Sequence, residues 1–118
     1  MLTLYGIPNC DTVRRARSWL ALRGVGHVFH DYKKQGIDEA VLRRWAAVLG
    51  WERIINRAGT TFRKLPEGDR QGLDQDSNQD RAIALMLAQP SLIRRPMVEG
   101  DGLLLVGFAE EAWLAAGM

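Results

Sequence analysis

The residue with the clearest chemical potential is Cys10, the single cysteine of this 118-residue chain. The apolar segment Leu2–Tyr5 before it predicts a buried strand, and the segment from Thr12 onward predicts a helix. A thiol at a helix start lies near free N–H groups and the positive end of the helix dipole, both of which favour an anion. Since the thiolate is the nucleophilic form, this position predicts a thiol with a lowered pKa.

The charges near Cys10 are mixed, because Asp11 is followed by Arg14, Arg15 and Arg17. A free cysteine often packs as a small buried apolar residue without chemical function. Its place at a helix start, close to several arginines, favours a reactive thiol over that alternative.

Length and composition limit the class of protein. A chain of 118 residues, 47% hydrophobic and 25% charged, fits one globular domain with one core. A formal charge of +2 is too small to indicate a nucleic-acid partner. The N-terminus has no secretory pattern, and no apolar run approaches the roughly 18 residues that span a bilayer. One cysteine excludes an internal disulfide framework and fits a reducing compartment, so we expect a cytoplasmic protein without a membrane partner.

Hydrophobic periodicity and breaker residues predict the remaining elements. A strand over residues 25–32 follows the first helix, 12–23, through a short link, and this strand-helix-strand order implies a right-handed unit with parallel strand pairing. His27 and His30, three residues apart on that strand, fall on opposite faces, so we expect no metal site. The further elements are helices over residues 38–50 and 51–55, a helix from Ser77 to Pro90, strands over 97–99 and 103–106, and a helix over 109–116.

This order predicts an α/β protein with a thioredoxin-like (glutaredoxin-like) fold. Strand-helix-strand and strand-strand-helix halves, about residues 1–36 and 91–118, flank a helical insertion over about residues 37–90 within a single domain. Residues 33–36 are expected to form a polar turn, and residues 66–79 short helical turns and exposed loop. Residues 56–64 carry three cations and are expected to form a surface loop. That segment favours a solvated connector over a loop that holds an anion.

Four segments in order resemble the ArsC/Spx family, and within it the YffB-type branch of arsenate-reductase-like proteins. They are Tyr5–Thr12, Phe29–Tyr32, Gly59–Leu65 and Ile93–Pro96. The resemblance covers essentially the whole chain and implies a thioredoxin-like fold with a helical insertion. It also implies that Cys10 is the catalytic cysteine.

The resemblance further implies an anion site made of arginines. Arsenate reductases of the family hold the oxyanion with three arginines, of which Arg95 matches the second and Arg57 is the nearest candidate for the first. The third position is Gly107, which supplies no cation. Because one charge-assisted contact is then missing, arsenate is expected to be a poor substrate.

Other family features bear on the thiol itself. Pro96 matches a cis-proline that would turn the backbone of Arg95 toward the thiolate, where an extended peptide such as glutathione can pair. Asn9 and Thr12 would shape the turn and donate hydrogen bonds to sulfur. Val13 stands where a Cys-x-x-Cys pair would have its second cysteine, so the resolving thiol must come from another molecule.

The sequence therefore predicts a glutathione-dependent thiol-disulfide oxidoreductase that acts through Cys10. Glutathione is the expected co-substrate, and glutaredoxin or more glutathione the resolving partner. We expect a monomer, with no metal, no tightly bound cofactor and no direct contact with nucleic acid. The alternatives are a regulator that binds RNA polymerase or another protein, and a genuine arsenate reductase.

Overall fold

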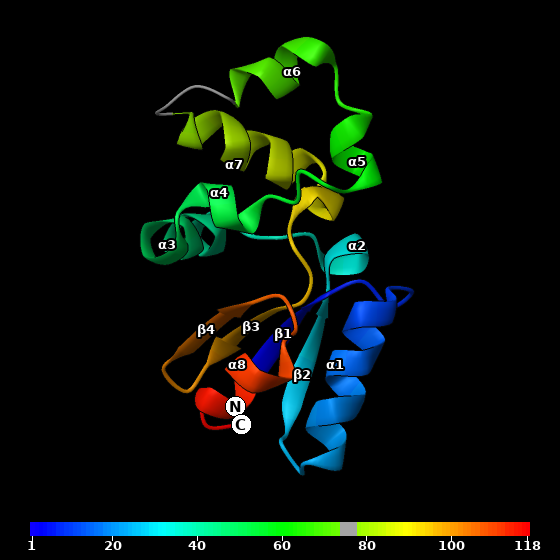
Figure 1. Cartoon of the computed structure of the whole chain (residues 1–118). Coiled ribbons are helices and arrows are strands. Elements are labelled where there is room, and N and C mark those ends of the chain that lie inside the picture. Colours follow the sequence, from blue (N-terminus) through cyan, green and yellow to red (C-terminus); the bar gives the residue numbers. More distant parts are fainter. Residues whose placement is uncertain (74–77) are drawn as a thin grey trace. The chain divides into compact units, whose positions relative to one another are not determined.

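The computed structural model describes residues 1–73 and 78–118 and divides into two compact units. One unit contains Met1–Gln35 and Arg95–Met118, and we call it the sheet unit. The other contains Gly36–Arg94, and we call it the helical unit. Figure 1 shows the helices and strands of each unit.

The sheet unit is built on four strands: β1 (Leu2–Gly6), β2 (His27–Asp31), β3 (Met97–Gly100) and β4 (Leu103–Val106). Their order across the sheet is β2-β1-β3-β4. β1 pairs with β2 in parallel, while β3 pairs antiparallel with both β1 and β4. The parallel crossover and the antiparallel C-terminal pair that the sequence predicts are both confirmed.

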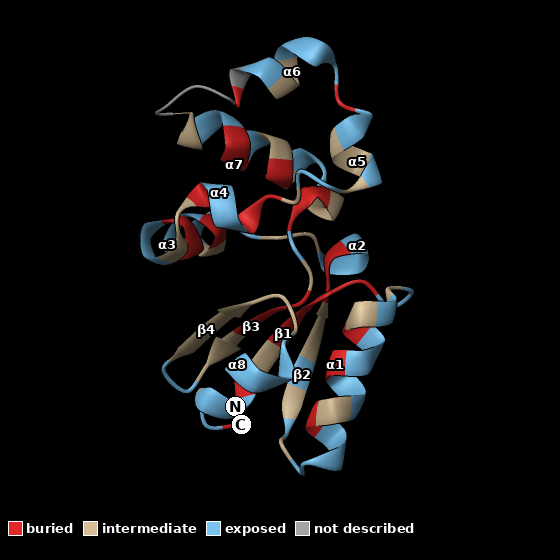
Figure 2. Ribbon diagram, viewed as in Figure 1, coloured by how far each residue is buried: buried red, intermediate tan, exposed pale blue. Residues whose placement is uncertain are grey.

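Three helices belong to the sheet unit: α1 (Asp11–Leu22), α2 (Tyr32–Gln35) and α8 (Glu110–Ala115). Figure 2 shows the buried stripe of α1, formed by Val13, Ala16 and Leu20. This stripe packs against a core that includes β1, β3 and α8, with Leu2, Leu4, Val98, Trp113 and Met118. The start of α1 lies very close to the end of β1. A Cβ added to Gly6 would be only 2.7 Å from a methyl group of Val13.

The helical unit contains five α-helices and one 3₁₀ turn among its described residues. They are α3 (Glu39–Leu49), α4 (Trp51–Ile54), α5 (Thr60–Arg63), α6 (Glu67–Gly72), α7 (Gln79–Ala88) and η1 (Pro90–Leu92). Asp38 caps α3 as predicted, since its Oδ1 accepts the N–H of Ala40 at 3.1 Å. Large apolar side chains from α3, α4, α7 and η1 are fully buried: Leu42, Trp45, Ile54, Ile83, Met86 and Leu92.

Two short segments differ from the sequence prediction. Residues 32–35 form α2 rather than the end of a strand and a turn, because Asp31 Oδ1 accepts the N–H of Lys33 at 2.9 Å and starts a helical turn. The predicted loop over residues 56–64 contains the helix α5, which begins after the extended Gly59. The predicted start at Ser77 lies outside the described residues, and α7 begins at Gln79.

Candidate active site

Cys10 occupies the N-cap position of α1, directly after the loop that leaves β1 (Figure 1). Its backbone is extended (φ −105°, ψ 124°), and its carbonyl accepts the N–H of Arg14 at 3.0 Å, the first helical hydrogen bond. The side chain is partly buried and packs against the core of the sheet unit. The predicted position of the thiol at a helix start is therefore confirmed.

The surroundings of Cys10 act on its pKa in opposite directions. Burial raises the pKa of the thiol. The backbone N–H of Val13, the hydrogen bond and charge of Arg95, and the backbone N–H of Thr12 together outweigh burial, so the pKa of Cys10 lies below its ordinary value. The side chain makes no capping hydrogen bond as a thiol. The thiolate is the form that these N–H groups stabilise.

Arg95 reaches Cys10 from a distant part of the sequence. It precedes Pro96 through a cis peptide bond, as the family resemblance implies, and Pro96 is followed by β3. Pro96 is buried, and its carbonyl accepts the N–H of Gly107 at 2.8 Å. The antiparallel register opposes Tyr5 to Met97, so the residues before β3 lie beside the chain that leaves β1.

The arginines of α1 have other partners. Arg14 forms an ion pair with Asp11, and the guanidinium of Arg15 lies 5.7 Å from the centre of the Phe108 ring. The guanidinium of Arg17 lies 4.4 Å from the centre of the Phe29 ring. The side-chain charge that lowers the pKa of Cys10 is that of Arg95, and not of these neighbours in sequence.

An aromatic cluster on β1, β2 and the start of α2 was not predicted as a cluster from the sequence. The ring centres of Tyr5 and His30, opposite each other in the parallel register, are 4.8 Å apart. Burial and the neighbouring Tyr5 raise the pKa of Tyr32 well above its ordinary value, while the charge of Arg95 lowers it. The buried Tyr32 hydroxyl has no hydrogen-bond partner among the described residues. The sequence did carry a signal for this cluster, because both predicted parallel strands contain aromatic residues that can lie opposite each other.

The other predicted site residues are placed as follows. Asn9 is exposed in the turn before Cys10, and Thr12 is partly buried in the first turn of α1. Gly107 follows β4 with φ +76°, a conformation that favours glycine. Arg57 belongs to the helical unit, where its Nη2 donates to the carbonyl of Leu73 at 3.2 Å. The assignment of Arg57 to an anion site at Cys10 stays a prediction.

Two features are absent from the described residues: a cluster of metal-ligating side chains and a helix that could span a membrane. In residues 1–73 and 78–118, no group of three or more His, Cys, Asp or Glu side chains gathers as a metal site would require. No helix in that part of the chain has the length and apolar character needed to cross a bilayer.

Comparison with known proteins decides the family. The ArsC family model matches residues 5–116. The chain belongs to the ArsC family. The solved structure of the protein YFFB (PA3664) is 52% identical, covers 98% of both chains and superposes with a TM-score of 0.90. An arsenate reductase (ArsC) related protein from Brucella melitensis is 50% identical over 97% of this chain and 92% of its own, with a TM-score of 0.74.

The relatives also include regulators. The global transcriptional regulator Spx of Enterococcus faecalis is 32% identical over 94% of this chain and 82% of its own. The structural neighbours share the thioredoxin-like fold, which confirms the predicted fold class. The proteins similar to this chain thus include one named as related to arsenate reductase and others named as regulators of transcription.

Proposed function

We propose that this protein is a glutathione-dependent thiol-disulfide oxidoreductase whose nucleophile is Cys10. The observation that carries the proposal is the position of Cys10 at the start of α1 within hydrogen-bond reach of Arg95, an arrangement that lowers the pKa of the thiol. A lowered pKa increases the fraction of thiolate, which is the form that attacks a disulfide. The single cysteine fits the cytoplasm, where glutathione is the abundant thiol.

The reaction runs in two exchanges. The Cys10 thiolate attacks the glutathione sulfur of a mixed disulfide, a new sulfur–sulfur bond forms at Cys10, and the substrate leaves as a thiolate that takes up a proton. A second glutathione thiolate then attacks the glutathione sulfur on Cys10 and leaves as oxidised glutathione, which restores the Cys10 thiolate. The substrate disulfide is reduced, and two glutathione molecules end as one disulfide. Val13 in place of a second cysteine makes the external thiol necessary.

Three residues beside the thiol serve glutathione and sulfur in this proposal. The guanidinium of Arg95 pairs with a glutathione carboxylate as well as with the thiolate. The N–H groups of Thr12 and Val13 stabilise the sulfur anion each time it forms.

Mass spectrometry of the intact protein after incubation with oxidised glutathione tests the proposal. The expected result is one glutathione adduct at Cys10, which excess reduced glutathione removes, and none on a Cys10→Ser variant. Turnover of a small glutathione mixed disulfide should depend on Cys10 in the same way. If the thiol alkylates readily but neither forms the adduct nor turns over the disulfide, the proposal is wrong.

A second candidate function is regulation through binding of RNA polymerase, favoured by the similarity to Spx over most of the chain. Retention of purified RNA polymerase on the immobilised protein tests it. Binding that the Cys10→Ser variant retains, together with absent disulfide exchange, would favour the regulator over the enzyme.

A further inference from the structure

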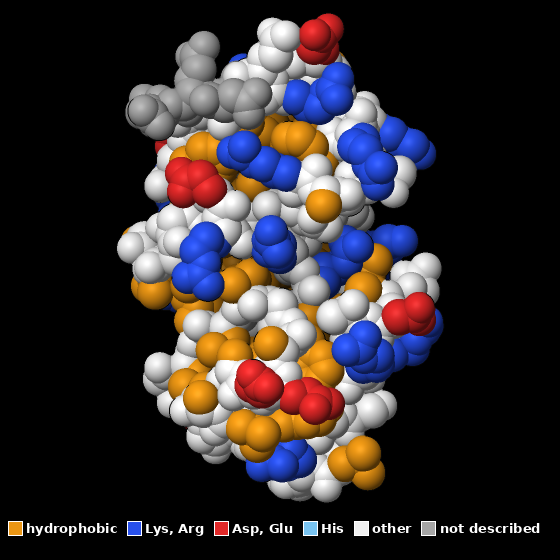
Figure 3. Space-filling view, in the orientation of Figure 1, with side chains coloured by type: hydrophobic (Ala, Val, Ile, Leu, Met, Phe, Trp, Pro, Cys, Tyr) orange, Lys and Arg blue, Asp and Glu red, His pale blue; other side chains and the backbone are white. Residues whose placement is uncertain are grey.

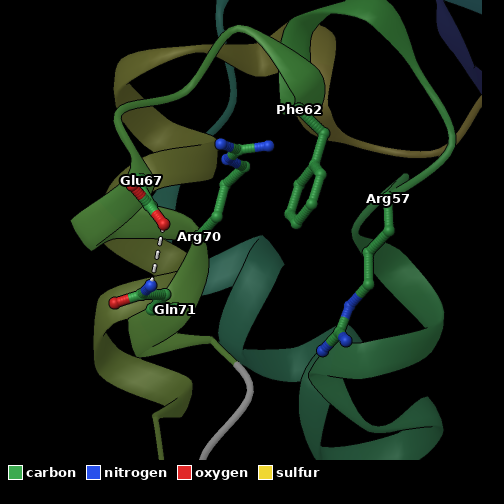
Figure 4. Close-up of a pocket in the computed structure, with 5 residues that line it drawn as sticks. All are labelled: Arg57, Phe62, Glu67, Arg70 and Gln71. Carbon is green, nitrogen blue, oxygen red and sulfur yellow. Dashed lines mark hydrogen bonds between the residues drawn. The ribbon is translucent and has the colours of Figure 1, made fainter.

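The helical unit contains a pocket of its own, with a volume of about 340 Å³. Arg57, Phe62, Glu67, Arg70 and Gln71 line it, from α5, α6 and the segment before α5. Figure 4 shows the Phe62 side chain directed between Arg70 and Arg57. The volume falls at the small end of the range of about 300–1,000 Å³ typical of ligand pockets. Every lining residue belongs to the same compact unit.

Arg70 is the most informative residue of this pocket. Its Nε atom is buried, and no acceptor among the described residues forms a hydrogen bond with it. An unsatisfied buried donor destabilises a fold, and more so when the group is charged. The Nε–H of a guanidinium is half of the planar fork that binds carboxylates and phosphates through two parallel hydrogen bonds. A ligand oxyanion in the pocket would supply the missing acceptor.

The lining as a whole has mixed character, with two cations, Arg70 and Arg57, against one anion. Arg57 brings the second guanidinium, which is positioned by the carbonyl of Leu73 and by the ring of Trp51, 5.5 Å away. Glu67 brings the one carboxylate, and its Oε1 accepts a hydrogen bond from Nε2 of Gln71 at 3.1 Å. Figure 3 shows apolar side chains between Lys and Arg side chains on one face of the helical unit.

We propose that this pocket binds a small organic anion with one carboxylate or phosphate group and an apolar portion. The oxyanion accepts hydrogen bonds from Arg70 and pairs with the charge of Arg57. The apolar portion contacts the ring of Phe62. The two arginines set the preference for an anion, and Phe62 favours an organic anion over an inorganic one.

The test is a titration of the ¹⁵N-labelled whole protein with benzoate and, separately, with phenyl phosphate, which compares the two anion types. The expected result is a saturable shift of the amide resonances of Phe62, Arg70 and Gln71. Benzyl alcohol, which has the ring without the anion, should bind at least about tenfold more weakly because it loses the charge-assisted hydrogen bonds. Inorganic phosphate, which has the anion without the ring, should bind about tenfold more weakly because it loses the contact with Phe62. Benzyl alcohol that binds as tightly as both anions would overturn the proposal, as would absence of saturable shifts with both.

Substitutions locate the site. Arg70→Gln should weaken benzoate binding about tenfold or more, and Glu67→Gln should strengthen it because the opposing carboxylate is removed. Arg63→Gln is the matched control, since Arg63 lies exposed on α5, donates to the carbonyl of Ala58 and does not line the pocket. Circular dichroism checks the fold of each variant. The proposal is overturned if Arg63→Gln weakens benzoate binding as much as Arg70→Gln does. It is also overturned if neither Arg70→Gln nor Glu67→Gln changes benzoate binding. The Cys10→Ser variant should bind benzoate like the wild type. A failure of the pocket proposal can therefore be distinguished from a failure of the proposed thiol function.

Discussion

The sheet unit and the helical unit position their charged groups by different means. In the sheet unit, strand pairing sets Arg95 beside Cys10, and backbone N–H groups of α1 complete the surroundings of the sulfur. In the helical unit, the pocket residues come from short helices of four and six residues and the connecting segment. The thiol site therefore depends largely on backbone geometry, whereas the pocket depends on the identity of a few side chains.

The largest expected effect separates the two regions chemically. Cys10→Ser should abolish the glutathione adduct and all disulfide exchange, because serine supplies no thiolate at neutral pH. The free energy of unfolding should change little, since the side chain is small and only partly buried. Mass spectrometry and urea denaturation measure the two quantities. Exchange activity that remains in the variant would remove Cys10 from the reaction.

Arg95→Ala tests a side chain that strand pairing brings to the thiol. The pKa of Cys10 should rise, because a hydrogen bond and a favourable charge are both lost. The pH profile of iodoacetamide alkylation should shift to higher pH, and glutathione affinity should fall about tenfold or more. Arg15→Ala is the control, since Arg15 lies over Phe108 and should leave the profile unchanged. An unshifted Arg95→Ala profile would show that backbone groups alone hold the pKa.

Glycine substitutions compare how tightly the two units are packed. Gly6→Ala should destabilise the protein by about 1–3 kcal/mol, because the added Cβ would lie 2.7 Å from a methyl group of Val13. Gly68→Ala in α6 meets nothing within 4 Å and should stabilise by about 0.4–1 kcal/mol. Thermal or urea unfolding measures both. Equal effects of the two substitutions would mean that the contact between β1 and α1 is not tight.

The smallest expected effect concerns arsenate. The wild type should reduce arsenate with a kcat/KM below about 10⁴ M⁻¹s⁻¹, the lower end of the common enzyme range, since Gly107 offers no cation. Gly107→Arg should improve arsenate binding at a stability cost of about 1–2 kcal/mol, because φ is +76°. Gly107→Ala shares the backbone strain without the charge and is the matched control. Assays coupled to glutathione and glutaredoxin compare the three proteins. Equal arsenate affinity in the two variants would show that the missing cation is not limiting.

Local patterns predicted the longer elements and the four-residue helix α4 correctly, but missed the helices α2 and α5. The apolar period of α3 and the capping position of Asp38 were both sufficient, because eleven residues give several turns of periodicity. The helices α2 and α5 contain four residues each, about one turn, which is too short for a period to be visible. Their formation depends on side-chain contacts such as that of Asp31 with the N–H of Lys33.

The sequence by itself determined that one thiol stands at the start of a helix after a buried strand, because strand, turn and helix signals are local. It also determined, through the family resemblance, that Pro96 follows a cis bond. The resemblance pointed to Arg95 at the thiol, but only the tertiary structure showed that its guanidinium, rather than those of the arginines next to Cys10 in sequence, lowers the pKa of Cys10. Asp11 pairs with Arg14 beside the thiol, while the antiparallel pairing of β1 with β3 sets Arg95 next to the end of β1. Strand register is a property of two distant segments together, and neither segment carries it alone.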